Sequence, residues 1–150
     1  YSCSKLTTIP PIDTSNGTSF ANMFYSCSKL TTIPPIDTSN GTSFANMFYS
    51  CSKLTTIPPI DTSNGTNFSY MFFNCTALEN VTFEGTFNVK SNISVFSSSP
   101  NLTVDSLMSF INALNNTGTG TYTVTIGSTN LAKLTAEQIQ IATAKNITLA

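Results

Sequence analysis

Hydrophobic residues recur along the first half of the chain with a fixed period. The segment 1–24 is repeated without change as residues 25–48 and then, with three differences, as residues 49–72. Those differences are Asn67, Ser69 and Tyr70. Self-similarity at a period of this size is typical of a solenoid, in which each repeat buries its apolar side chains against its neighbours. The sequence therefore predicts a stack of similar coils.

The pattern inside one unit predicts a short strand followed by a turn. Residues 6–12 form a short segment that contains β-branched residues and is bounded by turn formers, which is typical of a strand. Pro10 and Pro11 lack N–H groups, so regular pairing should stop near Ile9. Residues 13–17 combine Asp, Asn and Gly, which favour tight turns. The extended segment should thus end in a turn in every unit.

A short helix is expected after that turn, because Phe20, Met23 and Phe24 have the i, i+3, i+4 spacing of one helix face. Thr18 or Ser19 is placed to cap its first turn. Each coil would then be a strand, a turn, a short helix and a return. The side chains predicted to point inward in each unit are Cys3, Leu6, Ile9, Ile12, Phe20, Met23 and Phe24.

The remaining chain departs from the period. Residues 73–96 form a degenerate fourth unit, and a fifth begins with Ser99 in the Cys place and Leu102 in the Leu place. We therefore divide the chain into a solenoid, residues 1–102, and a capping subdomain, residues 103–150. Such an atypical terminal unit covers the last hydrophobic face of a solenoid.

The capping subdomain has its own local signals. Apolar spacing predicts a helix over 104–114, with Thr103 or Asp105 near its start. Alternation predicts a strand over 122–126 after a Gly- and Asn-rich stop, and a turn follows at 127–130. Thr135 and Gln138 have capping-box spacing and should open a helix that ends near Lys145. Residues 147–149 form a last short strand.

Composition narrows the classes of partner. Charged residues make up only 9% of the chain, the net charge is −1, and there is neither His nor Trp. The absence of a basic stripe argues against nucleic acid and against anionic membranes as partners. The hydrophobic fraction of 40% permits a real core, while the many hydroxyl and amide groups suit an extracellular surface.

The unit carries markers of a known family. Cys3, Leu6 and Ile9 at intervals of three residues are followed by Asp-Thr-Ser-Asn at 13–16 and by Met-Phe at 23–24. In these features the chain resembles the BspA-like leucine-rich-repeat surface proteins, strongly over 1–72 and weakly over 73–102. The tail is similar to the C-terminal cap of such proteins from gut Firmicutes and their phages. The resemblance implies a curved solenoid with strands on its concave face, secretion or surface display, and adhesion.

The four cysteines recur at the repeat period, and they admit two interpretations. Metal sites need clustered ligands such as Cys-x-x-Cys or His partners, which are absent here. We expect a structural row of buried thiols on the packed face; disulfides between adjacent coils are the alternative. The row comprises Cys3, Cys27, Cys51 and Cys75.

No constellation of residues points to catalysis, and we expect no cofactor, no metal and no enzyme activity. A Ser or Thr nucleophile needs a base, and the chain has no His. Asp13, Asp37 and Asp61 form an acidic row in which a calcium site is conceivable. An Asx turn, in which each carboxylate accepts from its own backbone, is the favoured interpretation.

The exposed side of the predicted strands is the candidate ligand-binding surface. Its residues lie between the inward positions of each unit, and they should point outward from the concave strands. A flat Thr array also suggests ice binding, but prolines and curvature would spoil the lattice match. The candidate ligand-binding residues are Lys5, Thr7, Thr8, Lys29, Thr31, Thr32, Lys53, Thr55 and Thr56.

Together these observations favour a non-enzymatic extracellular or cell-surface adhesion module. Its partner would be a host protein, a cell surface or a glycan, bound through many weak identical contacts. One alternative is a structural component of a phage virion, such as a tail-associated spacer or receptor-binding protein. The other is a filament-forming protein, because an uncapped face at Tyr1 would permit heterologous stacking.

Overall fold

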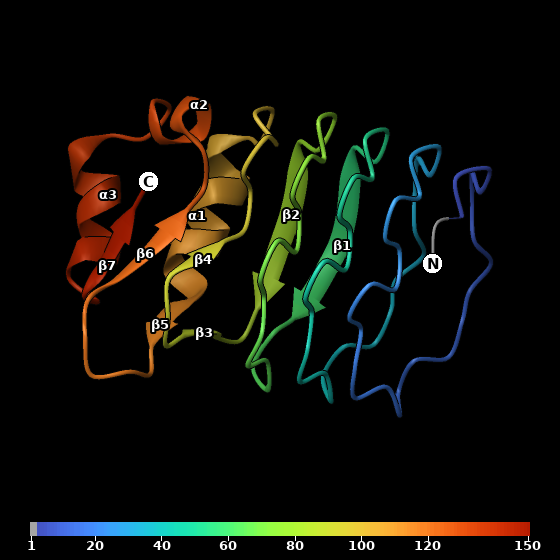
Figure 1. The fold of residues 1–150 in the computed structure, drawn as a ribbon, viewed down its shortest axis with the longest axis horizontal. Coiled ribbons are helices and arrows are strands. Elements are labelled where there is room, and N and C mark those ends of the chain that lie inside the picture. The colour runs from blue at the N-terminus through green and yellow to red at the C-terminus, as the bar shows by residue number, and fades with distance from the viewer. Residues whose placement is uncertain (1–2) are drawn as a thin grey trace.

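The computed structural model describes residues 3–150 (Figure 1). The open face that the sequence predicts at Tyr1 lies outside these residues. The seven strands in this range are β1 (Thr56–Asp61), β2 (Asn80–Glu84), β3 (Phe87–Val89), β4 (Ile93–Ser94), β5 (Leu114–Asn116), β6 (Tyr122–Thr125) and β7 (Ile147–Leu149). The three helices are α1 (Val104–Ala113), α2 (Ser128–Leu131) and α3 (Ala136–Thr143).

The predicted fold class, an α/β leucine-rich-repeat solenoid, is wrong. The described residues form a few short strands in three small parallel sheets, β1-β2, β3-β5 and β4-β6-β7, together with three short helices. All three helices follow residue 103, and between residue 3 and Thr56 there is no strand of a sheet. The unit of strand, turn and short helix that the repeat predicted is therefore not formed in any copy.

Backbone geometry explains why residues 20–26 are not a helix. Asn22 and Ser26 have φ angles of 59° and 56°, in the left-handed region that a right-handed helix excludes. The segment is a run of turns instead. The N–H groups of alternate residues in this segment donate to backbone carbonyls of the next copy. Asn22 donates to Ala45 at 2.9 Å, Phe24 to Met47 at 2.9 Å and Ser26 to Tyr49 at 2.7 Å.

Proline explains why, among the described copies, the extended segment forms a regular strand only in the third. Pro34 and Pro35 of the second copy face a third copy that carries Pro58 and Pro59, so both segments lack N–H donors where a ladder between them would run. β2, the partner of β1 on its other side, has no proline and pairs with it from Thr56–Asn80 to Asp61–Glu84. The register shifts between Ile57 and Ile60, where the two prolines of β1 lie.

The core consists of side chains that meet their equivalents in the neighbouring copies. Phe20, Phe44 and Phe68 stack with ring centroids 5.6 and 5.5 Å apart and nearly parallel planes. A second row, Phe24, Phe48, Phe72 and Phe96, has spacings of 5.3, 5.4 and 5.1 Å. The predicted inward set is buried throughout the second and third copies. In the first copy Phe20 and Phe24 are buried, whereas Cys3 and Ile12 are exposed.

Helix α1 covers the edge of β2. Its N-cap is Thr103, whose hydroxyl accepts from the Ser106 N–H. Within the helix, the hydroxyls of Ser106 and Ser109 accept from the N–H groups of Val81 and Phe83, at 3.1 and 3.0 Å. Side chains of α1 thus accept hydrogen bonds from N–H groups at the edge of β2 that would otherwise pair with a further strand.

The C-terminal elements match the sequence-based prediction closely. The predictions of α1, β6, α3 and β7 are confirmed, and Thr135 and Gln138 form the expected capping box. Two elements were missed: β5, in the stretch read as a stop, and α2, in the stretch read as a turn. In Figure 1 the three helices lie at the C-terminal end of the molecule's long axis, and successive copies of the unit lie side by side along it.

Candidate functional site

The residues predicted to bind a ligand are all exposed, at three Lys and six Thr positions in three copies. Backbone pairing joins part of this surface, since the Thr31 N–H and hydroxyl both donate to the Thr7 carbonyl, at 3.2 and 3.3 Å. On the other side the Glu79 N–H donates to the Thr55 carbonyl at 2.9 Å. We call this surface, formed by the nine predicted residues, the Lys/Thr face.

The cysteines are free thiols, three of them buried. The thiols of Cys51 and Cys75 donate to the carbonyls of Phe24 and Phe48, at 3.1 and 3.0 Å. Ser99 occupies the fifth place of the row and makes the same bond with its hydroxyl, to Phe72 at 2.6 Å. Burial raises the pKa of Cys51 to about 12, so this thiol carries neither the charge nor the access that metal binding or reactivity requires.

The acidic row forms Asx turns. The carboxylate of Asp13 accepts from the N–H and hydroxyl of Ser15, at 3.0 and 2.7 Å, and Asp37 accepts likewise from Ser39. These hydrogen bonds, first of all those from the serine hydroxyls, lower the pKa of Asp13 and Asp37. The carboxylates are thus occupied by their own turns.

Residues 3–150 present neither a metal-binding cluster nor a long apolar helix. No group of three or more His, Cys, Asp or Glu side chains within this range is arranged to hold a metal ion. None of the helices in the same range is long and apolar enough to cross a membrane.

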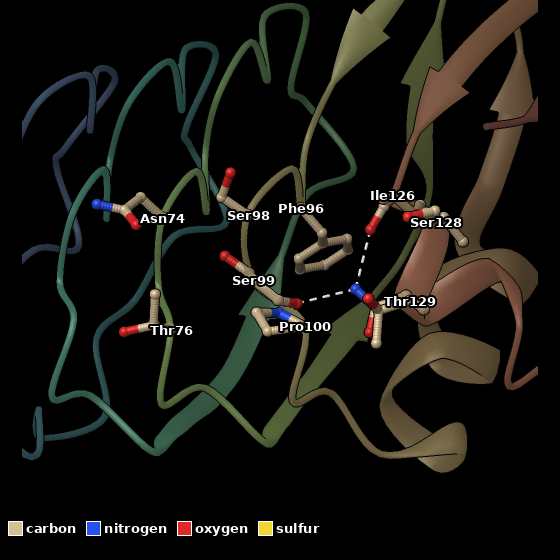
Figure 2. A pocket seen from close by; sticks show the side chains of 11 residues that line it. Asn74, Thr76, Phe96, Ser98, Ser99, Pro100, Ile126, Ser128 and Thr129 are labelled. Atoms are coloured by element: carbon tan, nitrogen blue, oxygen red, sulfur yellow. Dashed lines mark hydrogen bonds between the residues drawn. The ribbon is translucent and has the colours of Figure 1, made fainter.

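A pocket of about 370 Å³ lies where the last repeated segments meet the C-terminal part (Figure 2). One wall comes from residues 74–76 and 98–100, and the other comes from residues 126–130. Phe96 and Ile126 lie beneath it, almost fully buried, while Thr76, Ser98, Ser128 and Thr129 are exposed. Sequence reasoning missed this pocket because its two walls are far apart in the chain and carry no motif.

Asn130 holds the two walls together. It is only 1% exposed, and its amide nitrogen donates to the carbonyls of Ser99 and Ile126, at 2.8 and 2.9 Å. Figure 2 shows both bonds as dashed lines, and the one to Ser99 joins the two walls. The Asn130 side-chain oxygen accepts from the Lys133 ammonium at 3.1 Å. A buried amide with all of these partners fixes the shape of the pocket.

An outer aromatic row lies nearer the surface than the two buried phenylalanine rows, and its last member precedes the pocket residue Asn74. Tyr25, Tyr49 and Phe73 are half-buried and stack with centroids 4.9 Å apart. Tyr70 meets Phe73 edge to face at 5.8 Å and is 47% exposed. The signal that could have found Tyr70 was in the sequence, because the identical copies carry Asn22 and Asn46 at that position.

Comparison with known proteins returns one match. A family model described as "Mycoplasma protein of unknown function, DUF285" matches residues 2–110. No curated protein matches the chain at a significant level. The same is true of solved structures.

Proposed function

We propose that this chain, which belongs to the DUF285 family over most of its length, is a non-enzymatic extracellular binding module. It presents the Lys/Thr face to a host protein, a cell surface or a glycan. The observation that carries the proposal is the exposure of the same three side chains in each of three copies. Repeated presentation of one weak contact yields useful avidity when the ligand is repetitive too.

Charge supports the choice of this face. Lys5, Lys29 and Lys53 are exposed at equivalent positions, and the exposed turn that carries Asp13 lies at the other end of the same extended segment. The lysine side of the first two units would therefore meet an acidic or hydroxyl-rich surface away from the Asp turn, whereas the exposed Glu79 lies beside Thr55 of the third unit. The threonines beside each lysine add hydroxyl donors and acceptors.

The finer family assignment is part of the proposal. The family match is consistent with the BspA-like surface proteins that the motifs resemble. On that basis we place the protein outside the cell, with the segment 103–150 acting as the terminal cap. The serines of α1 that satisfy the edge of β2 support this role for the cap.

A cell-binding assay with graded variants tests the proposal. The labelled chain would be titrated on host epithelial cells by flow cytometry, with Lys→Glu and both Thr→Glu introduced in one, two or three copies. We expect each altered copy to weaken binding by more than the one before, because avidity depends on the number of contacts.

A matched control introduces the same charge change away from the Lys/Thr face. Thr143 and Thr148 are exposed in the C-terminal part and accept the same Thr→Glu substitution, and the exposed Lys90 accepts the Lys→Glu substitution. Equal loss with the control set, or unchanged binding after all three copies are altered, would refute the role of this face.

A further inference from the structure

The pocket between the repeated segments and the C-terminal part has the features of a binding site for an uncharged, hydroxyl-rich ligand. The described residues that line it include no Asp, Glu, Lys or Arg. The exposed groups on its rim are the hydroxyls of Thr76, Ser98, Ser128 and Thr129, and Asn74 adds an amide. Hydroxyls and amides both donate and accept, so they pair with ligand hydroxyls. The Lys133 ammonium contacts two of the lining residues, but it donates to the carbonyls of Pro100 and Leu102 and to the side-chain oxygen of Asn130, so its three donors are used within the protein.

The pocket is also pre-formed. The buried amide of Asn130 ties the two walls together through its bond to the Ser99 carbonyl and is fixed within its own wall by its bond to the Ile126 carbonyl. Phe96 and Ile126 provide a tightly packed apolar floor. A concave site with an apolar floor and a few fixed polar groups loses little entropy when a ligand binds.

Tyr70 supplies an observation that is independent of the pocket. It occupies the left-handed region, with φ of 56°, at a position where the two identical copies carry Asn. Asn adopts this conformation easily and a bulky ring does not. The chain nevertheless places an exposed tyrosine there and supports it edge-on against Phe73.

Tyr70 is close in the chain to one of the residues that line the pocket. Tyr70 and Asn74 are four residues apart, so their Cα atoms are separated by no more than about 14 Å. An exposed aromatic side chain presents an apolar surface with a polar tip, which fits the C–H face of a sugar ring whose hydroxyls enter the pocket.

We propose that Tyr70 and this pocket form a binding site for a neutral oligosaccharide of a few sugar units. This inference rests on the proposed function in one respect only, namely that the protein is a binding module. It assigns the ligand to residues outside the Lys/Thr face, so the two proposals fail separately.

The test is a printed array of neutral oligosaccharides of two to six sugars, with sulfated and sialylated forms of the same glycans included. Positive glycans would be titrated by calorimetry against the unaltered chain and two variants. Thr76→Trp fills the mouth of the pocket, and Tyr70→Asn restores the residue of the other two copies. We expect each variant to weaken binding at least about tenfold, with neutral glycans preferred over their charged forms.

The repeat provides the matched controls. Ser52→Trp places the same side chain at the same position one copy earlier, where Ser52 bonds to the Ser28 carbonyl much as Thr76 bonds to Ser52. It should leave glycan binding unchanged. Thermal unfolding of each variant checks that the fold is retained.

Several outcomes would overturn the proposal. One is the absence of any neutral glycan that binds, and another is a preference for charged forms. A third is binding that Ser52→Trp weakens as much as Thr76→Trp does. If Tyr70→Asn lowers the melting temperature and leaves glycan affinity unchanged, the ring serves only to cover Phe73, and the proposed site is refuted.

Discussion

The repeated copies and the C-terminal part bury aromatic residues in opposite ways. In the copies, equivalent rings stack face to face with interplanar angles of 5–21°, as Phe24, Phe48 and Phe72 show. Where the chain enters the C-terminal part, Phe110 meets Phe87 and Phe96 edge to face, at 80° and 87°. A translation from one copy to the next can produce only the first arrangement, because identical side chains in identical backbones must lie parallel.

The hydrogen bonds differ in the same way. Within the copies, a residue donates to the next copy, as the Phe24 N–H does to the Met47 carbonyl. In the C-terminal part, side chains cap local elements, as Thr103 and Thr135 do at the starts of α1 and α3. The copies are thus held by tertiary contacts, whereas the C-terminal helices carry their own start signals.

The largest effect is expected at Phe48, which is fully buried between Phe24 and Phe72. Phe48→Ala should lower the free energy of unfolding by about 3–5 kcal/mol, because the cavity forms between two rings that cannot close together. Phe110→Ala should cost a similar amount. Urea denaturation measures both.

Tyr49→Phe is the control for Phe48, since unit four already carries Phe73 at that position of the outer aromatic row. It should change stability by less than about 0.5 kcal/mol. If Phe48→Ala lowered the free energy of unfolding by less than about 1 kcal/mol while Phe110→Ala lowered it by the expected amount of about 3–5 kcal/mol, the stacked rows would contribute little to stability. The edge-to-face rings around Phe110 would then stabilise the fold more than the stacked rings do.

A smaller effect is expected where the two regions join. Ser106 is 5% exposed, and its hydroxyl accepts from the Val81 N–H while it donates to the Glu79 carbonyl at 3.0 Å. Ser106→Ala would leave a buried N–H unpaired, which should cost about 1–3 kcal/mol. Asn112→Ala on the exposed side of α1 is the matched control and should be nearly neutral; equal denaturation midpoints for the two variants would refute the role of the serine.

Features that depend on local sequence signals were predicted well, whereas features that depend on contacts between copies were not. The inward residues of the second and third copies, the caps at Thr103 and Thr135, and the strands β6 and β7 rest on local signals, and the structure confirms them. The helix expected over 20–24 fails because its N–H groups have better partners in the next copy, which no local pattern reveals.

Of the two candidate binding surfaces, the sequence predicted the Lys/Thr face but not the pocket. The sequence predicted exposure of the Lys/Thr face because its residues lie between the inward positions Cys3, Leu6 and Ile9 and their copies. The pocket was not predicted, because Ser99 and Asn130 come together only through the path of the chain between them. The sequence shows that Tyr70 differs from the residue at this position in the two identical copies. Only the structure shows that its φ angle is positive and that its side chain is exposed.

Turn and helix can be distinguished at Asn46, whose φ angle is 55°. In a helix Ala is more stable than Gly by about 1 kcal/mol, whereas in the left-handed region Gly is favoured by about 1 kcal/mol or more, since it has no Cβ. We therefore expect Asn46→Gly to unfold at higher urea concentration than Asn46→Ala. The reverse order would restore the helix predicted from the spacing of apolar residues.

The smallest effect concerns the exposed turn at Asp37, and its direction follows from linkage. Hydrogen bonds from the Ser39 hydroxyl and N–H hold the pKa of Asp37 below its ordinary value of 3.8 in the folded chain. The unfolded chain therefore binds the proton more tightly, so the carboxylate stabilises the fold above pH 3.8, and this contribution is lost as pH falls through the lower folded-state pKa. Asp37→Asn should lower the urea midpoint slightly at about pH 7, and the difference between the two proteins should shrink as pH falls below 3.8 and Asp37 takes up its proton in the folded chain. A gap between the two proteins that stays the same across this range would mean that the carboxylate charge adds nothing to the turn, and that the Asx geometry, which Asn also forms, accounts for all of it.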